Sequence, residues 1–195
     1  GLAAAFEYDR ERPWQLWRWL TCHFAHFDGG QLFWSGGVFV AFAAWLEPHG
    51  RARLLAVLGV AAIAIPAAVA AFAPGLATYR GLSGLDSALF VLALAGVLRD
   101  ALVSGRRGAL ATAALFGLAF LAKLAWEVAF GAAVFARSGA FVPVPLAHAV
   151  GAAIGLVAEL TTRLQSTVSC RRRNAAVRPQ RSNQSAARMR CSDSG

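Results

Sequence analysis

The stretch GLSGLDSALFVLALAGVL, residues 81–98, decides the fold of this chain. After a polar beginning it is apolar throughout, and its length is close to the ~20 residues that a helix needs to cross a bilayer. Ser83 lies at the start of the stretch, and Asp86 follows about one helical turn later. Polar side chains in a membrane helix cost free energy unless they find partners, so they often mark a functional site. The stretch therefore predicts a membrane-spanning helix that begins with reactive groups.

Four more apolar segments of similar length accompany this stretch. Hydropathy predicts five spans in all, at residues 30–46, 54–74, 82–98, 109–135 and 140–160. Pro66 should kink the second span without ending it, because neighbouring helices can satisfy the carbonyl group that proline leaves free. Only 15% of the 195 residues are charged, whereas a soluble domain carries roughly 25%. We therefore expect an all-α, polytopic membrane helical bundle.

The chain divides into three predicted parts. Residues 30–164 form the transmembrane core. Residues 1–29 begin without methionine, and we expect them to hold the end of a truncated first span, followed by an interfacial segment at the outer face. The aromatic and basic side chains of that segment are Trp14, Trp17, Trp19, Arg10, Arg12 and Arg18. Residues 165–195 are polar and basic without apolar periodicity, so we expect a disordered tail.

Arginines predict the orientation of the spans. The formal net charge is +9, and the last 35 residues hold eight arginines and one acid. The loops at 47–53 and 99–108 also hold more arginines than the loops at 75–81 and 136–139. The positive-inside rule places the arginine-rich loops and the C-terminus in the cytoplasm. A basic tail of this kind is expected to touch anionic lipid, and no nucleic-acid partner is expected.

Ser83 and His148 are the candidate catalytic residues. Under this topology both lie in the first third of a span that enters from the outer side. The free N–H groups at a helix start favour the negative charge that nucleophilic attack creates, although a serine there can also be a simple helix cap. His148 can act as a base, or it can be a structural histidine bonded to a carbonyl group. Gly81 lets the loop before Ser83 turn sharply.

Small residues should allow the two spans to approach each other. They recur at every fourth position of each span, and they are Ala147, Gly151 and Gly155 on one span and Gly84 and Ala88 on the other. Such stripes permit the close approach that a Ser–His hydrogen bond requires. No carboxylate is placed to orient the imidazole, so we expect a dyad, with Asp86 as the only acid able to assist. Lys123 and Glu127 lie one turn apart and are expected to form a structural ion pair.

Cysteine and histidine patterns predict no metal, cofactor or disulfide framework. The three cysteines are scattered, and no pair has the spacing of metal ligands. His26 is expected to brace a loop, and a metal pair of His23 with His26 is disfavoured.

Three motifs together resemble the rhomboid family of intramembrane serine proteases. They are GLSG at residues 81–84, AHAVGAAIG at residues 147–155 and LTCHFAH at residues 20–26. The resemblance covers approximately residues 7–160, with the motifs in the family's order. It implies a rhomboid-like fold in which Ser83 attacks the scissile carbonyl of a membrane-anchored protein substrate. His148 would take up the serine proton and return it to the leaving amine.

A narrower match is to the rhombosortase branch of that family. Tyr79-Arg80 before the serine motif and KLAWE at residues 123–127 look like that branch. The resemblance implies that the substrates are exported proteins with a C-terminal Gly-Gly-type sorting tail. It also implies an integral protein of a bacterial inner membrane.

The chain departs from the family at the predicted oxyanion hole. Many rhomboids have a histidine and an asparagine where this chain has Gln31 and Ser35, which lie four residues apart on one helix face. Both side chains can still donate a hydrogen bond, so we expect an altered hole completed by the backbone N–H of Ser83. The loss of one donor costs ~3 kcal/mol of transition-state stabilisation.

Two alternatives to a protease remain open at the level of sequence. The first is an inactive rhomboid-like protein that binds membrane segments without cutting them. The second is a small transporter that uses Asp86, Lys123 and Glu127 as an ion path, which requires these three residues to line one continuous cavity while Ser83 and His148 lie apart.

Overall fold

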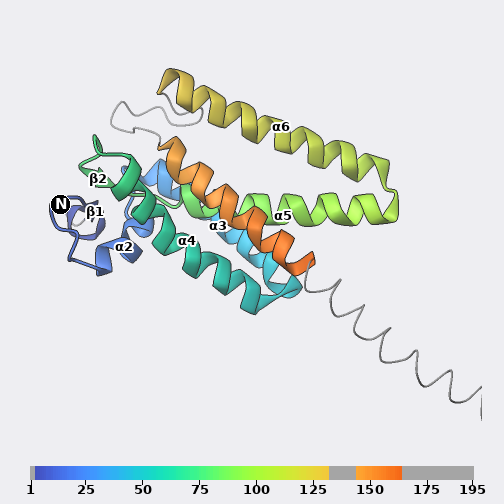
Figure 1. Cartoon of the computed structure of the whole chain (residues 1–195), viewed down its shortest axis with the longest axis horizontal. Coiled ribbons are helices and arrows are strands. Elements are labelled where there is room, and N and C mark those ends of the chain that lie inside the picture. Colours follow the sequence, from blue (N-terminus) through green and yellow to red (C-terminus); the bar gives the residue numbers. More distant parts are fainter. Residues whose placement is uncertain (1–2, 132–143, 164–195) are drawn as a thin grey trace, which may run out of the picture. The chain divides into compact units, whose positions relative to one another are not determined.

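The computed structural model describes residues 3–131 and 144–163, and within them the chain is mostly helical (Figure 1). The elements are α1 (Ala3–Phe6), β1 (Tyr8–Asp9), α2 (Trp17–Thr21), α3 (Gly29–Leu46), α4 (Arg51–Phe72), β2 (Thr78–Tyr79), α5 (Ser83–Ser104) and α6 (Arg107–Phe130). The C-terminal helix, Pro145–Arg163, follows them. Short 3₁₀ helices at Cys22–Phe24 and Glu47–His49 precede α3 and α4. The predicted tail at 165–195 and the stretch 132–143 lie outside the described residues.

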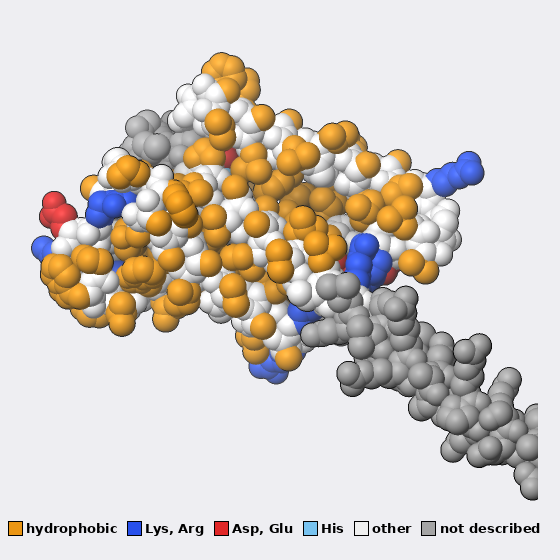
Figure 2. All heavy atoms as spheres, viewed as in Figure 1, with side chains coloured by type: hydrophobic (Ala, Val, Ile, Leu, Met, Phe, Trp, Pro, Cys, Tyr) orange, Lys and Arg blue, Asp and Glu red, His pale blue; other side chains and the backbone are white. Residues whose placement is uncertain are grey.

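Five of the described helices are long and apolar enough to cross a membrane. They are Gly29–His49, Arg51–Phe72, Ser83–Ser104, Arg107–Phe130 and Pro145–Arg163. Figure 2 shows hydrophobic side chains spread over the visible surface of the helices, as contact with lipid requires. The prediction of a mostly helical chain with five helices of membrane-spanning length is confirmed.

The helix ends differ from the predicted spans at two glycines. α5 continues to Ser104, beyond the predicted end at residue 98, and α6 stops at Phe130 instead of residue 135. The next residue in each case is a glycine with positive φ, 67° at Gly105 and 61° at Gly131. Each glycine N–H donates to a carbonyl of the preceding turn, which closes the helix in a left-handed cap. Hydropathy does not predict the end of α6, because the apolar composition continues past Gly131. It ends the earlier span too soon, at the charged Arg99 and Asp100, which α5 includes.

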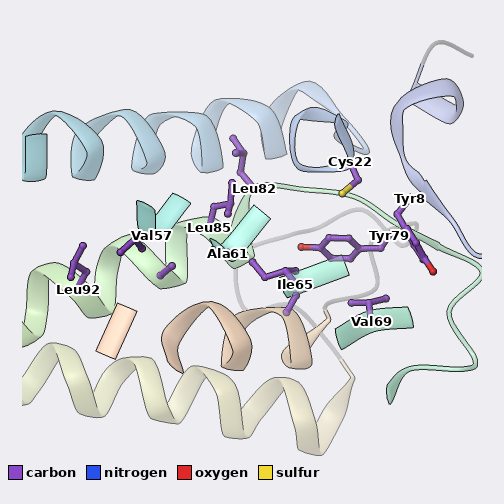
Figure 3. Close-up of a cluster of buried hydrophobic side chains, with 12 residues drawn as sticks. Tyr8, Cys22, Val57, Ala61, Ile65, Val69, Tyr79, Leu82, Leu85 and Leu92 are labelled. Atoms are coloured by element: carbon purple, nitrogen blue, oxygen red, sulfur yellow. The ribbon is translucent and has the colours of Figure 1, made fainter. Parts of the chain in front are cut away.

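The chain divides into two compact units, Gly1–Glu159 and Leu160–Gly195. In the first unit α4 passes through Pro66, which is buried and does not end the helix, as predicted. Figure 3 shows the buried apolar cluster of this unit with the ring of Tyr79 inside it. Its members are Tyr8, Cys22, Val57, Ala61, Ile65, Val69, Tyr79, Leu82, Leu85, Ala88, Leu92 and Ala147. The core therefore joins α4 and the start of α5 to the loop before α5 and to the beginning of the C-terminal helix.

The C-terminal helix, orange in Figure 1, packs against α5 backbone to backbone. A Cβ atom on Gly155 would lie 3.0 Å from the nitrogen of Leu92 and 3.1 Å from the carbonyl carbon of Ala88. A Cβ atom on Gly151 would collide in the same way with the carbonyl group of Gly84. The predicted small-residue stripes are thus confirmed as the contact. Because Gly84 meets Gly151 and Ala88 meets Gly155, the two helices run in the same direction and begin at the same end.

An unpredicted pair of two-residue strands holds the N-terminal segment against the loop before α5. β1 pairs antiparallel with β2, so that Tyr8 lies opposite Tyr79. The guanidinium of Arg10 donates to three backbone carbonyls at the end of α4 and in the loop after it, at 2.8–3.0 Å. The carbonyls of Val69 and Ala73 also accept backbone N–H groups, from Ala73 and Leu76, so the guanidinium adds a second donor to each of them. The loop that leads to Ser83 is therefore fixed from one side by residues far away in the sequence.

The expected interfacial segment is partly a structural element. Arg18 is buried, and its Nη1 donates to the carbonyl oxygens of Ala4 and Glu7 at 2.7 and 2.9 Å. Arg10 and Arg18 of the expected interfacial segment therefore donate to backbone carbonyls of the protein. Trp14 remains 70% exposed, as a headgroup contact requires.

A buried ionic cluster joins α4, α5 and the C-terminal helix at the end of the first unit that lies away from Ser83. Glu159 of the C-terminal helix is 1% exposed. It accepts hydrogen bonds from Arg53 of α4 and, at 2.8 Å, from Arg99 of α5. A buried carboxylate with two arginine partners is stable in an apolar setting, whereas an unpaired one is not. This cluster fixes the relative positions of the three helices at the end opposite to Ser83.

Candidate functional site

Ser83 is the first residue of α5, and it is half-buried. The preceding residue, Leu82, occupies the cap position, where no side chain bonds the helix. The first helical hydrogen bond runs from the Asp86 N–H to the Leu82 carbonyl at 2.9 Å. The alternative of a serine that merely caps the helix is therefore wrong. Ser83 therefore lies in the first turn of α5, where N–H groups lack helical partners, a setting that suits a nucleophile.

The loop before Ser83 has a conformation that needs glycine. Gly81 has φ of 122°, a region that residues with a side chain rarely adopt. Its N–H donates to the carbonyl of Cys22 at 2.9 Å, which ties the loop to the N-terminal segment. A Cβ atom on Gly84 would lie 2.8 Å from Cδ1 of Ile65 and 3.2 Å from the carbonyl oxygen of Ala147. A side chain at either glycine of the GLSG motif would therefore be strained or would clash with its neighbours.

His148 lies in the first turn of the C-terminal helix, at the same end of the first unit as Ser83. Ala147, whose carbonyl contacts the Gly84 position, directly precedes it. The predicted juxtaposition of the serine and histidine helices is therefore correct. Among the hydrogen bonds of the described residues, none joins Ser83 to His148, whose bonds run through Nδ1. Catalytic hydrogen bonds in enzymes without substrate are often long and tighten only in the complex.

Two charged residues of α6 contact the imidazole of His148. Nδ1 lies 2.7 Å from Oε2 of Glu127, and both residues are 3% exposed. The other oxygen of Glu127 accepts a hydrogen bond from Nζ of Lys123 at 2.7 Å. The Lys123 ammonium also lies 3.2 Å from Nδ1 of His148. The three side chains form one cluster, in which Glu127 and His148 are buried and Lys123 is partly exposed.

The expectation of a histidine without a carboxylate is wrong. Glu127 is 21 residues away from His148 in the sequence, and only the folding of α6 beside the C-terminal helix start brings the two together. The predicted ion pair of Lys123 with Glu127 is correct. The signal that sequence reasoning missed was that a carboxylate in a membrane helix has a second oxygen, which also needs a donor.

Asp86 is hydrogen-bonded to α3 and, within the described residues, has no hydrogen bond to the cluster of His148, Glu127 and Lys123. Its Oδ2 accepts a hydrogen bond from the hydroxyl of Ser35 on α3. The structure thus gives Asp86 no hydrogen bond to His148 and gives Ser35 a partner for its only hydrogen. The ammonium of Lys123 is near enough to Asp86 for the two charges to interact. Lys123 and Glu127 therefore contact the histidine, whereas Asp86 bonds Ser35.

The predicted oxyanion donor Gln31 lies beside the loop that carries the serine. Its Oε1 accepts from the N–H of Phe27 at 2.8 Å, and Asp28 caps the helix by accepting from the Gln31 N–H at 2.8 Å. These bonds turn the amide nitrogen towards the loop, where Nε2 is 3.3 Å from a Cβ built on Gly81. Of the two candidate donors, Gln31 has its N–H groups near the loop before Ser83, while the Ser35 hydroxyl is engaged by Asp86.

The two histidines before α3 have structural contacts. Nε2 of His23 lies 3.0 Å from the carbonyl of Ala62 in α4, and burial lowers the pKa of this histidine. Nδ1 of His26 lies 3.0 Å from the Phe24 carbonyl, as expected of a residue that braces a loop. Within the part of the chain that the structure describes, no group of three or more His, Cys, Asp or Glu side chains could hold a metal ion.

No family model, no curated protein and no solved structure matches this chain. The resemblance to rhomboid proteases therefore depends on the three sequence motifs alone.

Proposed function

We propose that this chain is an intramembrane serine endopeptidase of the rhomboid type. The observation that carries the proposal is the backbone contact between Gly84 and the Ala147 region, because it brings the helix starts of Ser83 and His148 together. Ser83 occupies the first turn of a helix of membrane-spanning length. A serine and a histidine at adjacent helix starts can form a nucleophile and base pair.

The proposed reaction is acyl transfer in two steps. Ser83 Oγ attacks the scissile carbonyl carbon while Nε2 of His148 takes the hydroxyl proton. The C–N bond then breaks, His148 gives its proton to the leaving amine, and an ester to Ser83 remains. Water, deprotonated by the same nitrogen, attacks the ester and releases the carboxylic acid product. The reaction needs no cofactor.

The oxyanion formed in each step needs donors at the helix start. The backbone N–H of Ser83 points along the helix axis and lacks a helical partner. The Gln31 amide is the second proposed donor, because it lies beside the loop at Gly81. Ser35 is the weaker candidate, because its hydrogen is used in the bond to Asp86. In the proposed oxyanion hole, the side-chain hydrogen bond therefore comes from Gln31.

The proposed substrates are membrane-anchored proteins, with the C-terminal sorting segments of exported proteins as the narrower class. The resemblance to the rhombosortase branch supports that class. The arginine distribution supports a site that opens on the outer side of a bacterial inner membrane, with the C-terminus in the cytoplasm.

Labelling with a fluorophosphonate probe tests the proposal. The purified protein in detergent should be labelled, and both Ser83→Ala and His148→Ala should lose the label while keeping their helical circular dichroism. Ser104→Ala, at the exposed far end of α5, is the matched control and should be labelled like wild type. Labelling that persists in Ser83→Ala would overturn the assignment of the nucleophile. A folded wild-type protein that takes no label would favour the inactive, segment-binding alternative.

A further inference from the structure

We propose that Glu127 is a positioning residue for His148, held in place by Lys123, so that the site works as a Ser–His–Glu arrangement. This inference rests on the proposed function. The contact with Glu127 determines which ring nitrogen of His148 carries the proton, and this tautomer can be measured even in a protein without activity.

The geometry at Nδ1 selects its protonation. The nitrogen has one position in the ring plane, which holds either a proton or a lone pair. Glu127 Oε2 lies 2.7 Å from it. A lone pair on Nδ1 at that distance would face the lone pairs of the carboxylate, which is repulsive. A proton there forms a charge-assisted hydrogen bond, so Nδ1 carries the proton and Nε2 is left with the lone pair of a base.

Lys123 keeps Glu127 in the acceptor state. Both the glutamate and the histidine are buried, and a lone buried carboxylate tends to take up a proton. The ammonium of Lys123 bonds Oε1 at 2.7 Å, which supplies the opposite charge. Each oxygen then has its own donor, lysine on Oε1 and histidine on Oε2. The distance from the Lys123 ammonium to Nδ1 of His148 is longer, at 3.2 Å. The main hydrogen bond of the lysine is therefore the one to the Glu127 carboxylate.

This arrangement suits the proposed reaction. When His148 takes the proton of Ser83, the imidazolium has Nδ1–H already bonded to a carboxylate, so no reorganisation is needed. In soluble serine proteases the carboxylate that binds Nδ1 has the same function, and its conversion to an amide lowers kcat by about 10⁴ through the wrong tautomer. Glu127 does not touch the reacting atoms, so its effect is exerted through the histidine.

The test is the isosteric change Glu127→Gln. Lys123 can only donate, so it takes the amide oxygen and turns the NH₂ group towards Nδ1. The imidazole must then accept at Nδ1 and carry its proton on Nε2. We expect ¹⁵N NMR of histidine-labelled protein in micelles, at mildly alkaline pH, to show Nδ1–H in wild type and Nε2–H in the variant. His148→Gln assigns the signal among the four histidines of the chain.

The rate of fluorophosphonate labelling is the second measurement, and it should fall by about 10²–10⁴ in Glu127→Gln. Glu127→Asp, which keeps the acid, should recover part of the rate. Glu159→Gln is the matched control: it also alters a buried carboxylate between cations, Arg53 and Arg99, but far from the histidine. It should lower stability without changing the tautomer or the labelling rate of the folded protein.

An Nε2–H tautomer in wild type overturns the inference, whether or not any variant folds. So does a folded Glu127→Gln protein with the wild-type tautomer and rate. Wild type that shows Nδ1–H but takes no probe contradicts the proposed function and leaves the positioning role of Glu127 standing. The two proposals therefore fail in different measurements.

Discussion

Substitution of Gly151 by alanine tests the helix contact on which the candidate site depends. A Cβ atom at Gly151 would lie 3.0 Å from the carbonyl carbon of Gly84 and 3.3 Å from the nitrogen of Ala88, and its clash with the Gly84 carbonyl oxygen is closer still. All three neighbours are backbone atoms, so no side chain can rotate to make room. The two helices must move apart by about 1 Å to restore normal van der Waals distances.

This displacement should have two effects of different size. Overpacking of a well-packed contact costs about 1–3 kcal/mol of stability. Misplacement of catalytic groups by about 1 Å costs about 10²-fold in rate. We expect Gly151→Ala to unfold at a lower fraction of denaturing detergent in mixed micelles. At conditions where the protein is fully folded, its fluorophosphonate labelling should be slower by about two orders of magnitude.

Two other helical glycines give matched controls. Gly96 lies in α5 and Gly59 in α4, and a Cβ atom at either position meets nothing within 4 Å. Alanine at these positions should be neutral or stabilising by about 0.5–1 kcal/mol, because glycine is a poor helix residue. If Gly151→Ala unfolds and reacts like Gly96→Ala, the close approach of the two helices is wrong.

Three further predictions concern the N-terminal segment. Burial raises the pKa of the Cys22 thiol to about 12, so Cys22 should resist maleimide at neutral pH in a Cys170→Ser/Cys191→Ser background until the protein is unfolded; rapid labelling of the folded protein would contradict this. Burial lowers the pKa of His23, so the unfolded chain binds the proton more readily and stability should fall as the pH drops below ~6.5, by at most about 1.4 kcal/mol per pH unit; an unchanged pH dependence in His23→Gln would refute it. Arg10→Met should lose the donors to three carbonyls and about 1.5–3 kcal/mol of stability, whereas Arg12→Met, whose side chain is 56% exposed, should change little in the same unfolding assay.

Sequence reasoning found the features that have a local or periodic origin. Apolar length gave the five helices, and the four-residue spacing of Gly151 and Gly155 gave the face of the C-terminal helix that meets α5. It also placed the candidate serine and histidine at the same end, because loop arginines predict which helices run in parallel. Each of these features can be predicted from the residues of one segment or from the number of arginines in each loop.

The features that it missed arise between distant segments. The contact of Glu127 with His148 joins two helices and has no periodicity of its own. The strands β1 and β2 have two residues each, too few to show alternation. The bonds of Arg10 were not predicted, because its partners are backbone carbonyls, and these have no signature in a sequence. The hydrogen bond from the Ser35 hydroxyl to Asp86 likewise depends on the packing of α3 against α5.

The pairing of β1 with β2 has a consequence for biosynthesis. Tyr8 finds its partner only when Tyr79 has left the ribosome, 71 residues later. At about 5–20 residues per second, this takes several seconds, during which α3 and α4 are synthesised while Tyr8 still lacks its strand partner. His148 arrives later again, after α5 and α6. If Ser83 and His148 form the proposed nucleophile and base pair, a chain interrupted before that point lacks the base, and an incompletely translated copy is then unable to cleave its neighbours.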